Sequence, residues 1–483
     1  MSETTVTETS VVKKRKKRRF LLIAAVILGV LAAVGWWHLF RKVPVYYASD
    51  EEHFKYGSIG LEEPIGLPYW LLLVMPRMFP EKLPGPGGYA SLGIVWEEGK
   101  EMPVGFTKTT IGIPRVGVNC AACHTTSVRK SPEDKPLLLL GGPAHQFDIQ
   151  AYQRFFIASA KDPRFTADAI LKELEYVHKF SFIEKILYRY IIIPFTKRGL
   201  LDQEKQFAWM NLRPDWGPGR TDMNPFKLMV LKLHDDGSVG NTDMMAIWNE
   251  RAHEGFLRHS DGLNPTLIEA SYSAALAAGA TAKSVDIPAV RRVNEWLLDL
   301  PSPAFPFPVN RELAARGKAI FDQQCASCHA FGASRVGKLI PLAEIGTDPS
   351  RAEHWTTEAA TEFNRQFDKY SWGFDHFQGH TGGYIALALD GIWARAPYLH
   401  NGAVPSLHDL LEPVERRPRI FYRGYDLYDP QSVGFVSNVS SKSGRQFSKF
   451  DTALPGNGNA GHLYGTALPA ADKSALMEYL KTF

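Results

Sequence analysis

The four cysteines of this 483-residue chain occur in two short motifs, each followed directly by a histidine. The motifs read Cys120-Ala-Ala-Cys123-His124 and Cys325-Ala-Ser-Cys328-His329. In a C-x-x-C-H motif the two thiols bond covalently to the vinyl groups of a haem, and the histidine binds the iron from one side. The sequence therefore predicts two covalently bound haem c groups, with His124 and His329 as iron ligands.

Other uses of paired cysteines explain less of this pattern. A zinc site made from two C-x-x-C pairs has about 15–20 residues between the pairs, whereas about 200 residues separate Cys123 from Cys325. A structural disulfide, or a thioredoxin-type redox pair, leaves both histidines unexplained. We therefore expect haem attachment at both motifs.

The ligand on the opposite side of each iron decides what a haem does. An iron with two protein ligands transfers electrons, whereas an open position can react with dioxygen or peroxide. Residues 310–483 hold one methionine, Met477, inside the last predicted helix, so methionine ligation is disfavoured. His462, in a glycine-rich loop before that helix, is the candidate sixth ligand, and an ordinary surface histidine is the competing interpretation. The other histidines of this region are His354, His376, His380, His400 and His408, with His376 and His380 the next candidates.

The first haem has no obvious sixth ligand in the sequence. The segment Met245–Gly262 is rich in aromatic, acidic and basic side chains, a mixture able to exclude water and to move a proton near a bound oxygen. Trp248 and His259 are the predicted catalytic residues of this pocket. The alternative is that the segment pairs with haem propionates and packs in an ordinary way.

The predicted fold is mainly α, with two haem domains, residues 44–300 and 310–483, joined by a proline-rich linker at 301–309. A capped helix beginning at Asn310 leads to Cys325, and Gly317 on it permits close approach of another element. The last helix covers 471–480. In the first domain, prolines and glycines in 110–120 indicate an extended entry to Cys120, and helices are expected at 148–160, 166–178, 180–194 and 287–300. The apolar helix 180–194 is interpreted as a core helix rather than a membrane contact.

The N-terminus has the pattern of a membrane anchor. Residues 1–19 hold seven Lys or Arg and two Glu, and residues 20–40 contain no Asp, Glu, Lys or Arg, a length that spans a bilayer. The basic tail indicates a cytoplasmic N-terminus, which places the rest of the chain in the periplasm. A cleaved signal peptide is the alternative. Without the basic tail, the net charge of +4 becomes about −1, which argues against a nucleic-acid partner.

A resemblance to a known family rests on residues 394–402, Ala-Arg-Ala-Pro-Tyr-Leu-His-Asn-Gly, followed by Pro405. This segment is similar to the A-P-Y-x-H-[ND]-G segment of the di-haem cytochrome c peroxidase superfamily, which includes a methylamine dehydrogenase maturation enzyme and the haem-dependent rubber oxygenases. Three features look more like the rubber oxygenase branch of this superfamily. They are the extended entry at 117–120, the segment around Trp248, and His462 close to the C-terminus. Residues 310–483 resemble a class I cytochrome c.

The resemblance implies a reactive N-terminal haem, an electron-transfer C-terminal haem, and calcium between them. Arg395 stands where relatives usually carry a threonine that helps to bind the calcium, which puts that ion in doubt; the backbone oxygens of Arg395 and Pro397 are its remaining candidate ligands. We therefore expect an inner-membrane-anchored oxidoreductase acting on peroxide or dioxygen, with a quinol-oxidising complex or a small cytochrome as redox partner. A pure electron carrier and a haem-based sensor are the alternatives. We do not expect this chain to share the polymer substrate of the rubber oxygenases.

Overall fold

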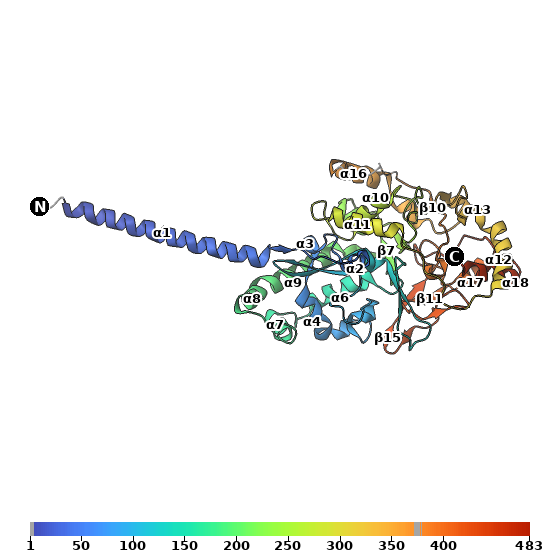
Figure 1. Ribbon diagram of the computed structural model, residues 1–483, viewed down its shortest axis with the longest axis horizontal. Coiled ribbons are helices and arrows are strands. Elements are labelled where there is room, and N and C mark those ends of the chain that lie inside the picture. The colour runs from blue at the N-terminus through green and yellow to red at the C-terminus, as the bar shows by residue number, and fades with distance from the viewer. Residues whose placement is uncertain (1–3, 371–376, 378) are drawn as a thin grey trace.

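The computed structural model describes residues 4–370, 377 and 379–483. A single long helix, α1 (Thr4–Leu39), projects from one end of a folded body (Figure 1). Its stretch Arg15–Trp37 is long and apolar enough to cross a membrane and is not buried by the body, although a signal sequence has the same features. The chain enters the body at once, because β1 (Lys42–Val43) pairs with β3.

The N-terminal part contains a four-stranded antiparallel sheet in the order β1-β3-β4-β2. Its central hairpin is β3 (Phe106–Ile111) and β4 (Ile113–Val118), and β2 (Leu67–Pro68) pairs with β4. The predicted extended entry to the first cysteine motif is confirmed, since β4 ends two residues before Cys120. Two further hairpins, β5–β6 (Thr125–Val128, Leu137–Leu140) and β7–β8 (Arg220–Asp222, Asn241–Asp243), lie in the same part.

Helices surround this sheet, and three predicted ones are confirmed. They are α6 (Ile149–Lys161), α7 (Ala167–Leu174) and α11 (Ile287–Leu298), each with an Asp or Thr side chain that accepts a hydrogen bond from the first turn. Helix α7 ends earlier than expected, and His178 instead stacks on Trp70 with ring centroids 4.2 Å apart. The remaining helices here are α2 (Asp50–Tyr56), α3 (Glu62–Ile65), α4 (Tyr69–Met78), α5 (Cys120–Cys123) and α10 (Leu267–Ala277).

The predicted helix at 180–194 does not stop at its proline. Helix α8 (Phe182–Leu187) passes through a π-helical turn, η3 (Tyr188–Ile192), into α9 (Ile193–Gln206). A π turn bonds i to i+5 and so already lacks regular i to i+4 bonds, which makes room for Pro194 without a break. One face of this rod packs into the core, as expected, whereas the other face is exposed.

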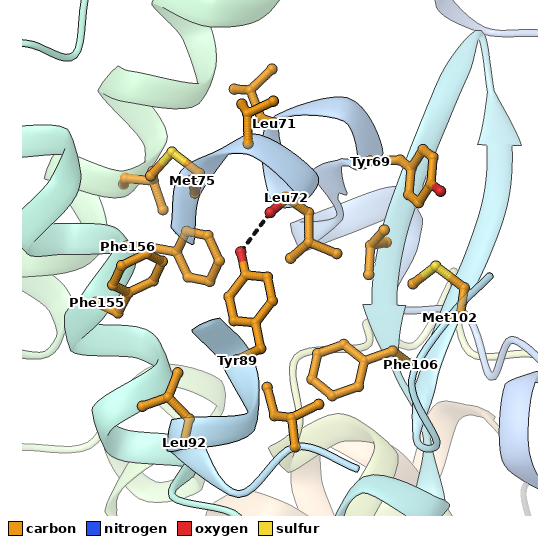
Figure 2. Packing of buried hydrophobic residues seen from close by; sticks show 14 of the residues in the cluster. Tyr69, Leu71, Leu72, Met75, Tyr89, Leu92, Met102, Phe106, Phe155 and Phe156 are labelled. Carbon is orange, nitrogen blue, oxygen red and sulfur yellow. Dashed lines mark hydrogen bonds between the residues drawn. The ribbon is translucent and has the colours of Figure 1, made fainter. Parts of the chain in front are cut away.

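The largest core lies between the sheet and these helices. In Figure 2, Tyr89 stands among Leu72, Met75, Phe155 and Phe156, with its hydroxyl donating to the backbone oxygen of Leu72 at 2.7 Å. That hydrogen bond satisfies the one polar atom that the ring carries into an apolar core.

The C-terminal part is organised by two helices, α12 (Arg311–Gln324) and α18 (Ala470–Leu480), which pack against each other. The predicted close approach at Gly317 is confirmed, because a Cβ there would lie 1.9 Å from the backbone oxygen of Ala475. The short helices of this part are α13 (Ala326–His329), α14 (Leu342–Ile345), α15 (Ser350–His354), α16 (Thr357–Phe367) and α17 (Leu407–Leu410).

Short antiparallel pairs complete the C-terminal part. They are β9–β10 (Leu339–Pro341, Gly383–Ile385), β11–β16 (Ile420–Arg423, Ser448–Asp451), β12–β13 (Tyr428–Asp429, Gly434–Phe435) and β14–β15 (Ser441–Lys442, Arg445–Gln446).

The two parts share cores across the proline-rich segment. Phe226 of the N-terminal part packs with Trp355 and Phe363 of the C-terminal part. The 301–309 segment itself has no regular structure, and its Phe305 packs against Trp393. The two cysteine motifs therefore lie on parts of the chain that pack against each other.

Candidate haem-binding sites

The first cysteine motif is held by a single asparagine. Asn119 caps the turn Cys120–Cys123 by accepting from the backbone N–H of Ala121, and its amide donates to the backbone oxygens of Phe54 (2.8 Å) and Gly57 (2.9 Å). These bonds join the motif to helix α2, so the backbone that presents both thiols is fixed before any haem is attached.

His124 is arranged as an iron ligand. Its Nδ1 lies 2.7 Å from the backbone oxygen of Met245 and must carry the proton, because a carbonyl only accepts. The Nε2 lone pair is therefore free for iron, the usual division of roles in a metal-bound imidazole. Burial lowers the pKa of His124 to about 4, which keeps the ring neutral.

The second motif repeats this arrangement on a different scaffold. Helix α12 ends at Gln324, the turn α13 carries Cys328, and the Nδ1 of His329 donates to the backbone oxygen of Leu387 at 2.6 Å. Burial lowers the pKa of His329 as well. Both histidines thus offer Nε2 to iron, which is the donor set that haem c requires.

The thiols do not resemble those of a redox pair. All four cysteines are half-buried and none is in a disulfide. Burial raises the pKa of Cys120 to about 11 and that of Cys123 to about 12, whereas a thioredoxin-type pair needs a lowered thiol pKa. Among residues 4–370, 377 and 379–483, no three His, Cys, Asp or Glu side chains gather as a metal site.

The structure brings His462 in front of His329. Their ring centroids are 6.2 Å apart, with the ring planes inclined by 48°. Since metal–imidazole bonds are about 2.0 Å long, two imidazoles on opposite sides of one iron have centroids about 6.3 Å apart. The spacing therefore fits a haem iron bound by both histidines. Burial, with some repulsion from His329, lowers the pKa of His462 to about 4.

A buried arginine, which the sequence gave no reason to single out, holds the loop that carries His462. All five N–H donors of Arg417 go to backbone oxygens, and none to a carboxylate. The acceptors are Leu410, Glu412, Asn459, Gly461 and His462 itself. Gly461 also packs on Gly346 at a distance that no Cβ would allow.

The other histidines of the C-terminal part have different surroundings. The Nδ1 of His354 is 2.7 Å from the Ser238 hydroxyl, and His400 stacks on Tyr384 with centroids 3.7 Å apart. His380 and His408 are exposed, and His376 lies outside the described residues.

His259 lies on a loop near the first haem motif. Burial, followed by the charge of Arg351, lowers the pKa of His259 to about 4, and His124 makes a smaller contribution in the same direction. Two residues on, Asp261 forms a fully buried ion pair with Arg351 at 2.9 Å. The loop is tied to the C-terminal part, because the backbone oxygen of Ser260 accepts from the N–H of Ile385.

Trp248 is completely buried between the two motifs. On one side it packs on Gly142, whose neighbour Gly141 is hydrogen-bonded to the backbone of His124. On the other side its indole N–H donates to the backbone oxygen of Asp390 at 3.0 Å. The guanidinium of Arg395, which donates to the backbone oxygen of Ala388, lies 5.6 Å from the indole ring.

The surroundings of Arg395 do not favour calcium. Its side chain donates to the backbone oxygens of Ala388 and Asp390 and forms an ion pair with the Asp390 carboxylate. The positively charged guanidinium thus binds backbone and carboxylate oxygens of the kind that calcium takes as ligands. The residues present do not fit the ion that the resemblance implies.

A family model described as RoxA-like, cytochrome c-like matches residues 383–422. The chain carries a cytochrome c-like domain. Such a domain holds haem c covalently, and the matched stretch includes both Leu387, which accepts from His329, and Arg417. The match supports a relationship to RoxA-like cytochromes c.

Two curated relatives, both from Sinorhizobium fredii, match part of the chain. The uncharacterized protein y4iM is 30% identical over 250 residues, covering 46% of this chain and 56% of that protein. The uncharacterized protein y4iJ is 29% identical over 237 residues, covering 36% of this chain and 39% of that protein. The chain thus spans 56% and 39% of the length of these two relatives, and their names assign no activity.

Proposed function

We propose that this protein is a membrane-anchored, periplasm-facing di-haem c-type cytochrome that acts as an oxidoreductase on peroxide or dioxygen. The observation that carries the proposal is the 6.2 Å spacing of the His329 and His462 rings. An iron bound by two imidazoles exchanges electrons without binding a substrate. The C-terminal haem is therefore the electron-transfer group.

The first haem is the reactive one in this proposal. Haem iron, when bound, supplies the redox chemistry with peroxide or dioxygen. The chain's own contribution is His259, neutral at pH 7 and able to take or give a proton at its imidazole. The buried Asp261–Arg351 pair two residues away fixes the charge around it and helps to exclude water.

Trp248 supports communication between the two sites. On the side of the first motif, the backbone of His124 is hydrogen-bonded to Gly141, whose neighbour Gly142 packs on the indole. On the other side, the indole donates to Asp390. Earlier in the same segment lie Ala388, which accepts from Arg395, and Leu387, which accepts from His329. A continuous packed path of this kind favours electron transfer between two haems. The role of Trp248 here is to bridge the sites, in addition to its predicted place in the first pocket.

The N-terminal helix supports the proposed location. A basic tail before an apolar helix keeps that tail in the cytoplasm, so the body lies in the periplasm. Electrons would then come from a membrane quinol-oxidising complex or a small periplasmic cytochrome.

A pure electron carrier is the second candidate. The observation that favours it is the buried, neutral imidazole of His259, because an imidazole of this kind is a suitable second ligand for the first iron. The two candidates differ in one property, the open coordination position of the N-terminal haem.

Electron paramagnetic resonance of the full-length ferric protein in detergent, with the haem content measured per chain, tests the proposal. We expect two haems per chain, one high-spin and one low-spin signal, and oxidation of the reduced protein by stoichiometric hydrogen peroxide or dioxygen. Two low-spin signals in both the ferric and the half-reduced protein, with no reaction with either oxidant, would establish the carrier instead. One haem per chain would overturn both.

A further inference from the structure

The rod formed by α8, η3 and α9 carries an apolar stripe that the body leaves uncovered. Phe182 is 78% exposed, and Tyr190 and Phe195 are each 69% exposed. The exposed large apolar residues within 176–195 are Tyr176, Phe182, Ile183, Ile186, Tyr190, Ile191 and Phe195. Isolated exposed apolar residues are ordinary, whereas a run of them on one element marks an interaction surface.

These residues face one way because of the helical geometry. Phe182, Ile186 and Tyr190 are four residues apart, and the π turn adds one residue, which brings Phe195 onto the same side. The opposite face enters the main core with Tyr188 and Ile193. The rod is therefore apolar on two sides, although only one side is used for folding.

Charged side chains border the stripe. Residues 176–199 contain one acidic residue, Glu184, and five basic ones, Lys179, Lys185, Arg189, Lys197 and Arg198. Three of the five form solvent-exposed ion pairs, Lys185 with Glu175, Arg189 with Asp168 and Arg198 with Asp202. Apolar residues on one face with a surplus of Lys and Arg beside them are typical of helices that lie in a membrane interface, where the basic groups meet anionic lipid headgroups.

The rod lies at the end of the body from which α1 leaves (Figure 1). Leu39, the last residue of α1, packs against the core cluster that includes Tyr188 and Ile193. Since only two residues separate Leu39 from β1, and a residue spans at most about 3.6 Å, the anchor cannot hold this end of the body away from the bilayer.

We propose that the stripe on α8, η3 and α9 docks into the outer surface of the membrane that holds α1. The partner is a lipid surface, which the apolar residues enter to the depth of the headgroup boundary while the basic residues contact phosphates. The proposal rests on the membrane anchoring proposed above. Two attachments, the anchor and the rod, fix the orientation of both haem sites relative to the bilayer, which a single flexible anchor does not.

Spin labelling of the full-length protein in vesicles of neutral and anionic phospholipid tests this. Ile186→Cys introduces one additional thiol for a nitroxide, because the native thiols are bonded to haem. Leu454→Cys is the matched control, since both side chains are 44% exposed and Leu454 belongs to the C-terminal part. We expect the label at 186 to collide with oxygen several-fold more than with a water-soluble nickel complex, and the label at 454 to show the reverse.

The outcomes separate the two proposals. Water-like accessibility at 186 in an intact, vesicle-bound chain would overturn the docking and leave the anchor in place. If mass spectrometry shows that the residues before the body have been cleaved off, the chain has no anchor. The docking proposal then stands only if the label at 186 still collides more with oxygen than with the nickel complex. Spin–spin broadening between labels at 186 would assign the stripe to a second copy of this chain and overturn the lipid assignment. Tyr190→Glu, at a position 69% exposed, should shift the 186 label towards water, whereas Phe331→Glu, at an exposed position of the C-terminal part, should not.

Discussion

The ring centroids of His329 and His462 lie 6.2 Å apart, although the two residues come from a helical turn and from a distant glycine-rich loop. His329 is fixed from behind by the backbone oxygen of Leu387. His462 has a left-handed backbone (φ 48°) and is held through the carbonyls of its own loop. The gap between the two rings is thus set by backbone contacts on both sides.

Replacing His462 with alanine should open the C-terminal iron. We expect His462→Ala to convert the low-spin signal of that haem to high-spin and to raise its reduction potential, because an imidazole donor that stabilises the ferric state is lost. Paramagnetic resonance and a redox titration measure both effects. His408→Ala, which removes an exposed histidine of the same part, should leave the spectrum unchanged. An unaltered low-spin signal in His462→Ala would rule out this ligand.

Arg417 should influence the spin state and the reduction potential of the C-terminal haem. It does so by holding the loop that carries His462 and by its positive charge. We expect Arg417→Gln to give a mixture of high- and low-spin C-terminal haem, and to lower the potential of the low-spin fraction because a buried positive charge is removed. Arg417→Lys keeps the charge with fewer donors, so it should retain more of the potential. The neighbouring Arg416→Gln is the control, because Arg416 is exposed and pairs with Glu412. Equal potentials in the Gln and Lys variants would exclude the charge effect.

His259 should affect only the N-terminal haem. In His259→Ala we expect the rate of reaction with peroxide to fall about 10²-fold or more, as when a general acid–base group is lost, while the C-terminal low-spin signal stays the same. Stopped-flow absorbance gives the rate. A first haem that changes from low-spin to high-spin in this variant would instead identify His259 as an iron ligand and support the carrier.

Gly317 should be required for the packing of α12 on α18. A methyl group there meets the backbone oxygen of Ala475, so Gly317→Ala should destabilise the protein by about 1–3 kcal/mol, as overpacking does. Urea unfolding followed by circular dichroism measures this. Gly199→Ala is the matched helical control, with nothing within 4 Å of the added Cβ, and should stabilise by about 0.5–1 kcal/mol. Equal effects of the two changes would contradict the close contact.

His145 should make the contact between the two parts sensitive to acid. Its ring stacks on Phe435 with centroids 3.8 Å apart, its Nε2 is 3.1 Å from the backbone oxygen of Tyr425, and burial lowers its pKa well below the usual value. The unfolded chain therefore binds this proton first, so the stabilisation is complete above about pH 6.5 and is lost as pH falls below it, by up to about 1.4 kcal/mol per pH unit. Unfolding free energies measured from pH 7.5 to 5 should fall more steeply in the wild type than in His145→Gln. Parallel curves would exclude His145 as the cause.

The sequence alone determined the features that depend on local pattern. Two C-x-x-C-H motifs predict haem attachment because both thiols and the ligand lie within five residues, and Gly317 on a capped helix predicts a close helix contact from periodicity. The extended entry to Cys120 follows from its prolines and glycines. The helical segments were also predictable, although the π turn before Pro194 was not, because i to i+5 bonding has no sequence signature.

Only the tertiary structure decided which groups meet across the chain. The carbonyls of Met245 and Leu387 that orient the two histidines are backbone atoms, which any residue type supplies, so no composition or spacing predicts them. Arg417 looked like one charged residue among several until its five donors were found on buried carbonyls. The exposed side of the α8–α9 rod could not be predicted from the sequence either, because an apolar sequence does not show which of its two faces packs into the core.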